Sequence, residues 1–214
     1  MTTFQYASDQ SLMISFGDTI DLDTHHRVLK LLRLLEADPI VGVRNLHPAY
    51  TSILVVFDPL HQNHAALQNA LQSRLARLDS IQLPEPRTVE IPVAYGGDSG
   101  PDLQELADVR GLTPAQVIEL HSSASYLVYF IGFVPGFAYL GGLPPVLATP
   151  RLQSPRKTVP KGSVAIGGSH TGIYPFETPG GWRLIGRTPL EIFDANSSDL
   201  SRLRIGDMVR FIPL

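Results

Sequence analysis

The sequence predicts an α+β protein with two domains: a ferredoxin-like α/β domain over residues 1–86 and a mainly β domain, either a barrel or a sandwich, over residues 87–214. In the first part, strand and helix patterns follow the order strand, helix, strand, strand, helix, strand, which is typical of a split βαβ fold. Two prolines within residues 83–87 indicate a stiff linker. After Ser125, short apolar runs alternate with Gly and Pro, which favours a barrel or a sandwich.

The elements of the N-terminal domain are predicted from hydrophobic periodicity. Residues 11–16, with the sequence SLMISF, are typical of a strand. A helix capped by Asp23 or Thr24 follows, because apolar residues recur at helical spacing up to about Ala37. The further expected elements are strands at 41–46, 52–57 and 88–93 and a helix at about 63–78.

Two short helices, at 102–110 and 113–122, are expected at the start of the C-terminal domain. The second has a clear N-terminal signature, with Thr113 as the cap, Pro114 at the first helical position and Gln116 three residues after the cap. Everything that follows is predicted to be strands and loops. The expected strands are 126–133, 162–168, 172–177, 182–189, 190–194 and 208–214.

The composition excludes several classes of protein. Hydrophobic residues make up 43% of the chain and charged residues 17%, so the chain can fill a core. A net charge of −3 argues against a general nucleic-acid binder or a binder of anionic membranes. The absence of cysteine excludes disulfides and thiolate chemistry. The N-terminus does not resemble a signal peptide and the apolar run at 127–134 is too short to span a bilayer, so we expect a soluble, cytoplasmic protein.

Common catalytic motifs are absent from the sequence. Residues 162–169, GSVAIGGS, have the glycine spacing of a phosphate-binding loop, but Gly168 occupies the position of the lysine and strands surround the segment. No dinucleotide-binding, zinc-protease or nucleophile-elbow motif occurs. The adjacent His25 and His26 point to different sides of a helix, so we expect a solvated pair and no metal site.

The densest concentration of Gly and Pro lies in residues 126–194, which also contain the only tryptophan, Trp182. Such a composition is typical of a segment in which the shape of the backbone matters more than regular structure. Several cations, tyrosines and a histidine lie in the same stretch. The sequence therefore predicts a binding site shaped by backbone loops in this segment.

Four motifs stand out in this stretch: GFVPGFAYLGGLP, PRKTVPKGSVAIGG, GIYPFETPGGWRLIGRTP and LEIFD. They resemble the allophanate hydrolase subunit 1 family, which includes the B subunit of the bacterial 5-oxoprolinase and the Kip-type inhibitor of a histidine kinase. The resemblance is dense over residues 126–194 and looser over the rest of the chain. It implies that the C-terminal domain is a cyclophilin-like β-barrel.

The resemblance also implies a function. It suggests one component, inactive alone, of an ATP-dependent amide-ring hydrolase that opens 5-oxoproline (pyroglutamate) to L-glutamate together with the A and C subunits as partners. Because a lactam is a stable amide, phosphorylating its oxygen with ATP is a plausible route, and such a site needs cations and backbone donors. ATP is therefore the expected cofactor, shared with the partner subunits. This chain offers Arg156, Lys161 and Arg187 beside glycine-rich backbone.

Each candidate residue also has a structural interpretation. Arg156 lies in a proline-bracketed loop, where it either aims a cation into a site or forms a salt bridge. His170 is a candidate general base. Tyr139 and Tyr174 are candidates for a pocket or for the core, and Trp182 is suited to lining a groove or to the core. The candidate catalytic residues are Arg156, Lys161 and His170, and the candidate substrate-binding residues are Tyr139, Tyr174, Trp182 and Arg187.

Two other functions remain open from the sequence. Kip-type members suggest a regulatory protein that inhibits a sensor histidine kinase, and the urea amidolyase relationship suggests half of a carboxyltransferase that handles biotin. A cyclophilin-like barrel by itself does not imply prolyl isomerase activity, because one fold supports many functions.

Overall fold

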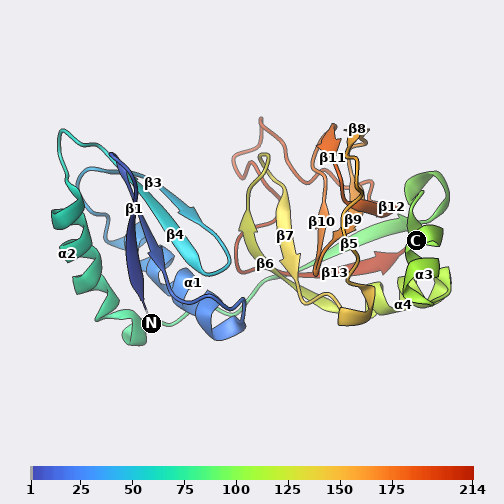
Figure 1. Ribbon diagram of the computed structural model, residues 1–214, viewed down its shortest axis with the longest axis horizontal. Coiled ribbons are helices and arrows are strands. Elements are labelled where there is room, and N and C mark those ends of the chain that lie inside the picture. Colours follow the sequence, from blue (N-terminus) through green and yellow to red (C-terminus); the bar gives the residue numbers. More distant parts are fainter. Residues whose placement is uncertain (1) are drawn as a thin grey trace. The chain divides into compact units, whose positions relative to one another are not determined.

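The computed structural model describes residues 2–214 and contains two compact units, of which the first ends at Glu85 and the second is Pro86–Leu214 (Figure 1). The first unit is built on a four-stranded sheet and the second on a closed barrel. The prediction of an α+β protein is confirmed. Within the described residues, no helix is long and apolar enough to cross a membrane.

The N-terminal unit packs two helices against one sheet. The sheet order is β1 (Thr3–Ser8), β2 (Ser11–Ser15), β4 (Ser52–Phe57) and β3 (Val43–Pro48), and all neighbouring strands are antiparallel. The helices are α1 (Leu22–Ala37) and α2 (His64–Leu75), followed by a 3-10 turn at Leu78–Ser80. Alternate residues of β4, such as Ile53 and Val55, are fully buried, as a strand with one covered face requires. The cap of α1 is Asp21, whose carboxylate accepts the Thr24 N–H, and not Asp23 or Thr24 as expected.

The ferredoxin-like order predicted for this unit is not confirmed. The strand expected at 88–93 does not join this sheet, because it belongs to the barrel of the second unit. Its expected position beside β2 is filled by β1, which precedes the first predicted strand. The six residues of β1 give a weak signal because most of them are exposed at the sheet edge.

His25 is fully buried in α1, so the expectation of a solvated histidine pair is wrong. Its Nδ1 lies 3.2 Å from the carbonyl oxygen of Tyr50. Burial lowers the pKa of His25 to about 4, because a charged imidazolium loses its hydration inside the unit. At neutral pH this histidine is therefore part of an apolar core.

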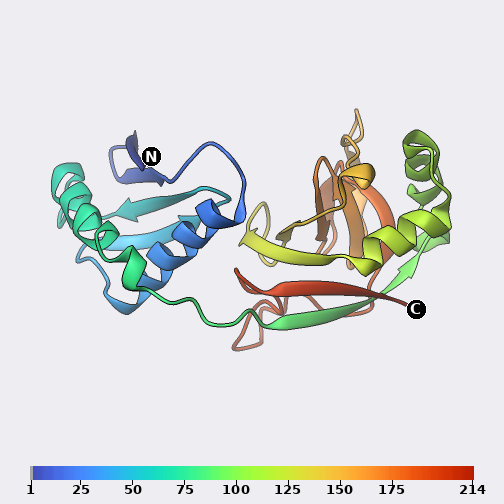
Figure 2. The same cartoon turned by 90° about the horizontal axis from the view of Figure 1, so that it is seen from below.

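The second unit contains a closed barrel of seven strands, which confirms the predicted barrel. The strands are β5 (Thr88–Tyr95), β6 (Ser125–Ile131), β7 (Ala138–Gly141), β9 (Ser163–Gly167), β10 (His170–Ile173), β12 (Arg183–Arg187) and β13 (Met208–Pro213). They follow one another around the barrel in the order β10, β7, β6, β13, β5, β12, β9. The first strand, β5, and the last, β13, run parallel side by side, while the other neighbouring pairs are antiparallel (Figure 2).

Smaller elements surround the barrel. They are the helices α3 (Leu103–Arg110) and α4 (Pro114–Ser123), 3-10 turns at Gly97–Ser99 and Pro145–Leu147, and a separate two-stranded sheet of β8 (Arg156–Val159) and β11 (Thr178–Gly180). The capping box predicted at Thr113 and Gln116 is present. The strand expected at 190–194 is not formed, since only one isolated bridge, from Phe193 to Ser201, occurs there.

A directed chain of hydrogen bonds crosses the barrel core. The hydroxyl of Thr171 donates to the carbonyl of Ala165, so it accepts from Nε2–H of His121, 2.9 Å away. Nδ1 of His121 is then the acceptor for the Tyr95 hydroxyl at 2.7 Å. Burial lowers the pKa of His121 to about 3, which is consistent with this neutral tautomer. The chain therefore connects β5, α4 and β10 through polar groups that satisfy one another.

Candidate functional site

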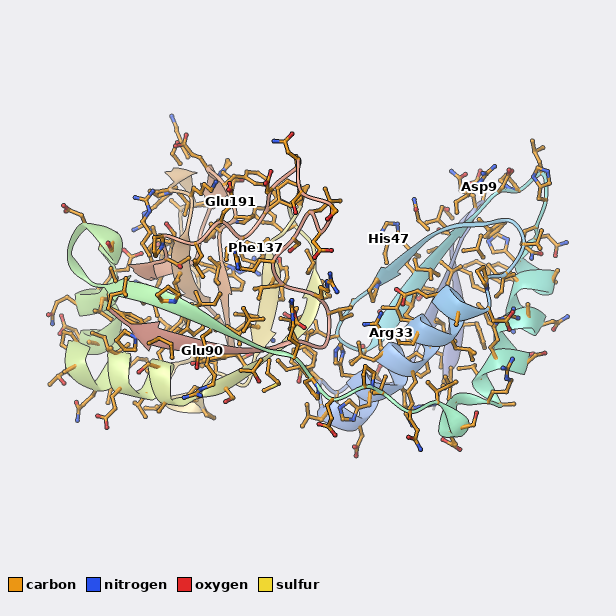
Figure 3. All side chains as sticks on the ribbon, turned by 180° about the vertical axis from the view of Figure 1, so that it is seen from behind. Asp9, Arg33, His47, Glu90, Phe137 and Glu191 are labelled. Atoms are coloured by element: carbon orange, nitrogen blue, oxygen red, sulfur yellow. The ribbon has the colours of Figure 1, made fainter. Side chains whose placement is uncertain are left out.

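Three of the predicted substrate-binding residues, Tyr139, Tyr174 and Trp182, meet around Phe137. We call these four residues the aromatic cluster. Ring centroids of Phe137 lie 5.1 Å from Tyr139, 5.1 Å from Tyr174 and 5.4 Å from Trp182, in edge-on contacts that aromatic pairs prefer. Phe137 is buried within the second unit (Figure 3). Tyr139 is only partly buried, so the cluster reaches the surface through this residue.

Glycine allows these rings to pack directly on the backbone. A Cβ atom at Gly167 would lie 2.5 Å from the indole of Trp182, and one at Gly180 would collide with the Tyr174 hydroxyl. The backbone of Trp182 forms a hydrogen bond with that hydroxyl. The glycines of the second and third motifs therefore include positions of close approach between ring and backbone, in addition to tight turns.

His170, at the start of β10, lies close to the cluster together with Arg151, which sequence reasoning missed. The guanidinium carbon of Arg151 lies 5.9 Å from the centroid of the Trp182 ring. Burial lowers the pKa of His170, and the positive charge of Arg151 lowers it further. The same charge acts on the hydroxyls of Tyr139 and Tyr174, whose pKa values burial raises. At neutral pH the site thus holds a neutral imidazole, two protonated phenols and a cation.

A signal for Arg151 was present in the sequence. The stretch ATPRLQSP places Arg151 directly after Pro150, as Arg156 follows Pro155 in the next motif. A stiff loop is a good place to aim a long cation, and both arginines follow a proline in such a loop. Arg151 lies outside the four family-like motifs, whereas Arg156 lies inside the second.

The guanidinium of Arg156 has one paired terminal nitrogen and one that is buried without an acceptor among the described residues. Its Nη2 donates to the Asp102 carboxylate at 2.5 Å, which matches the salt-bridge interpretation of this residue. Its Nη1 is buried and has no hydrogen-bond acceptor among the described residues. Its charge also lowers the pKa of Tyr174, in the same direction as Arg151. Arg156 therefore borders the aromatic cluster.

Lys161 and Arg187 lie elsewhere, around a cavity of about 450 Å³ that we call the cationic hollow. Ser99, Thr188, Leu190 and Leu214 also line it. Lys161 Nζ pairs with the Glu191 carboxylate at 2.5 Å, and Arg187 Nε donates to the Lys161 carbonyl at 2.8 Å. Trp182 of the cluster packs on Gly167 at one end of β9, whereas Arg187 pairs with Ser163 at the other end, where the backbone of Tyr174 also bonds to Gly162 and Ser163.

The fold and these two groups define a class: a β-barrel protein that presents cations beside aromatic hydroxyls, an arrangement suited to small anionic ligands. The model of the family described as "Carboxyltransferase domain, subdomain C and D" matches residues 2–203. The chain belongs to this family, and the resemblance to the allophanate hydrolase subunit 1 type is confirmed.

Named relatives are similar over most of the chain. The 5-oxoprolinase B subunit of Bacillus subtilis (strain 168) is 39% identical over 214 residues, which are 95% of this chain and 89% of the relative. The protein of the same name from Escherichia coli O157:H7 is 58% identical over 130 residues, 61% of this chain and 60% of the relative. The urea amidolyase of Saccharomyces cerevisiae is 25% identical and is covered only to 13% of its length.

A solved structure supports the fold. The crystal structure of TTHA0988 matches 97% of this chain with a TM-score of 0.85 and 34% sequence identity. This chain spans 40% of the length of that protein. The matched part of TTHA0988 is therefore one portion of a larger polypeptide.

Proposed function

We propose that this chain is the B subunit of a multi-subunit, ATP-dependent 5-oxoprolinase that opens 5-oxoproline to L-glutamate together with the A and C subunits. The observation that supports this most is the identity of 39% across nearly the full length of a relative that is named as the B subunit of 5-oxoprolinase. That name implies an assembly of several chains. We propose that the chain by itself does not hydrolyse 5-oxoproline.

The reaction makes definite demands on a site. ATP would phosphorylate the lactam oxygen and leave as ADP. Water would then add to the ring carbon that carries this oxygen. The bond from that carbon to the ring nitrogen would break as the nitrogen takes up a proton and inorganic phosphate leaves. His170, which is neutral at pH 7, is suited to accept the proton of the attacking water. Tyr139, which is partly exposed, remains protonated and can donate a hydrogen bond to the ring, whereas Tyr174 is buried behind it.

We propose that the cationic hollow contacts the phosphates of the shared ATP, because Lys161 and Arg187 line it and Glu191 balances only one of their two charges. In the assembled enzyme, Lys161→Ala is expected to raise the KM for ATP several-fold with a stability change below about 1 kcal/mol, since its pair with Glu191 is exposed. Steady-state kinetics and thermal unfolding measure the two effects. Lys157→Ala, an exposed lysine on β8, serves as the matched control. An unchanged KM for ATP in Lys161→Ala would show that the cationic hollow does not contact ATP.

Reconstitution tests the proposed function itself. The purified chain alone is expected to release no glutamate from 5-oxoproline and ATP, and the mixture with the A and C subunits is expected to release glutamate and phosphate in equal amounts. Mixtures from which one component at a time is omitted provide the control. Full activity of the chain alone, or none in the complete mixture, would contradict the proposal.

A carboxyltransferase half is the second candidate, because the family model carries that name and urea amidolyases are distant relatives. This alternative predicts that a biotin carrier protein co-purifies with the chain and that carboxyl transfer to or from biotin depends on it. Glutamate release in the reconstitution without any biotin protein would favour the oxoprolinase.

A further inference from the structure

We propose that Arg151 and Arg156 bind the carboxylate of a small monoanionic substrate at the aromatic cluster. The inference rests on the proposed function and deepens it, since it names the group by which a lactam acid is held. The fold accounts for one guanidinium nitrogen of Arg156, through Asp102, but for no ion pair of Arg151 within residues 2–214. Three features of the described residues lead to this assignment.

The first feature is the uncompensated charge of Arg151. This side chain is exposed, and it forms no ion pair with any carboxylate within residues 2–214. The guanidinium nevertheless lies over Trp182 rather than projecting away from the protein. An arginine held on an aromatic face keeps the edge of its fork available for a planar carboxylate.

The second feature is the unsatisfied nitrogen of Arg156. Asp102 accepts from Nη2, while Nη1 is buried without an acceptor among the described residues. A buried cationic N–H that lacks an acceptor is costly, so it is usually met by a water or a ligand oxygen. The side chain as a whole retains 29% exposure, but this exposed part excludes Nη1, so a ligand must displace neighbouring atoms to reach that nitrogen.

The third feature is that both arginines flank one short segment: Arg156 pairs with Gly180 across β8 and β11, and the N–H of Leu152, next to Arg151, donates to the Gly181 carbonyl. The guanidinium groups of Arg151 and Arg156 each favour ionisation of the same hydroxyl, that of Tyr174. Asp102 balances one of these two positive charges, which leaves a single excess positive charge beside Tyr139 and His170. A monocarboxylate neutralises this charge, whereas a phosphate with its larger charge would exceed it.

Binding to the full-length chain tests the assignment. Trp182 is the only tryptophan, so its fluorescence reports directly on ligands that reach Arg151. The probes are 5-oxoproline, pyrrole-2-carboxylate and the uncharged lactam 2-pyrrolidinone. We expect saturable fluorescence changes with the two acids and none with 2-pyrrolidinone. Arg151→Ala is expected to weaken acid binding roughly tenfold or more, as the loss of a charged hydrogen bond implies.

Two further variants separate a binding role from a structural one. Arg156→Lys keeps a cation for Asp102 but removes the second nitrogen, and it should also weaken binding. Arg210→Ala removes an exposed arginine of β13 and should leave binding unchanged. The imidazole of His170, followed by NMR, should show a raised pKa when an acid is bound, because a carboxylate favours the imidazolium.

The outcomes distinguish the inference from the proposed function. Equal binding by the wild type and Arg151→Ala, or equally tight binding of 2-pyrrolidinone, would overturn the inference. If the isolated chain binds no acid, the KM for 5-oxoproline is measured in the mixture with the A and C subunits instead. An unchanged KM in Arg151→Ala would then overturn the inference. If that mixture is inactive, the proposed function is contradicted. The carboxylate site is then tested by the binding of pyrrole-2-carboxylate, which must be weaker in Arg151→Ala than in the wild type.

Discussion

Replacing Asp102 with alanine is expected to lower the free energy of unfolding of the barrel unit by about 3 kcal/mol. The Asp102 carboxylate accepts both the Arg156 guanidinium and the buried Leu184 N–H, the latter at 2.7 Å. Alanine leaves both donors without an acceptor. The estimate is at the low end for a broken buried pair, because Arg156 keeps some contact with water.

Urea unfolding followed by Trp182 fluorescence measures this loss. Asp102→Asn, which retains an acceptor for Leu184, is expected to lose less than Asp102→Ala. Arg156→Ala and the double variant complete a thermodynamic cycle, in which the double loss should be smaller than the sum of the single losses. Glu90→Ala is the control, since both side chains of its pair with Arg210 are exposed. Additive losses would show that the ion pair contributes nothing of its own.

Acidification from pH 7 to pH 5 is expected to cost the barrel unit about 2 kcal/mol through His121 alone. Burial lowers the pKa of His121 to about 3 in the folded state, whereas the unfolded chain titrates near 6.5. Between these values the unfolded state binds a proton that the folded state excludes. The stability is therefore fully present above pH 6.5 and is lost as the pH falls toward 3.

Urea titrations at pH 7, 6 and 5 measure this slope. His121→Gln removes the titrating group, so its stability should be lower at pH 7 but less dependent on pH than that of the wild type. In the N-terminal unit, the buried His25 should produce a similar loss, since its pKa is lowered to about 4. Parallel slopes for the wild type and His121→Gln would show that His121 is protonated without opening the core.

The sequence predicted local structure well and strand pairing poorly. The capping box at Thr113 and the strand at 52–57 depend on neighbouring residues, and both are present. Membership of a sheet is decided by distant partners, which periodicity does not identify. Residues 88–93 are a strand as predicted, but they pair with Met208–Pro213, about as far away as the chain allows, and not with the N-terminal sheet.

The same distinction applies to the site. Tyr139, Tyr174 and Trp182 were predicted one by one from residue type, and the barrel brings them together around Phe137. Arg187 follows Trp182 closely in sequence, but an extended strand carries it roughly 16 Å away, into the other group. Closeness in sequence thus overstated closeness in space. The roles assigned to these residues stay predictions until the variants are measured.

The place of β13 in the barrel has a consequence for biosynthesis. This last strand lies between β5 and β6 and pairs with both. The two strands therefore stay unconnected until residues 208–213 have left the ribosome. Until then the nascent barrel is an open sheet with two unpaired edges, a form prone to wrong pairing with other chains. The second unit therefore closes only after translation of its final strand, while the N-terminal sheet, complete by Phe57, can form well before.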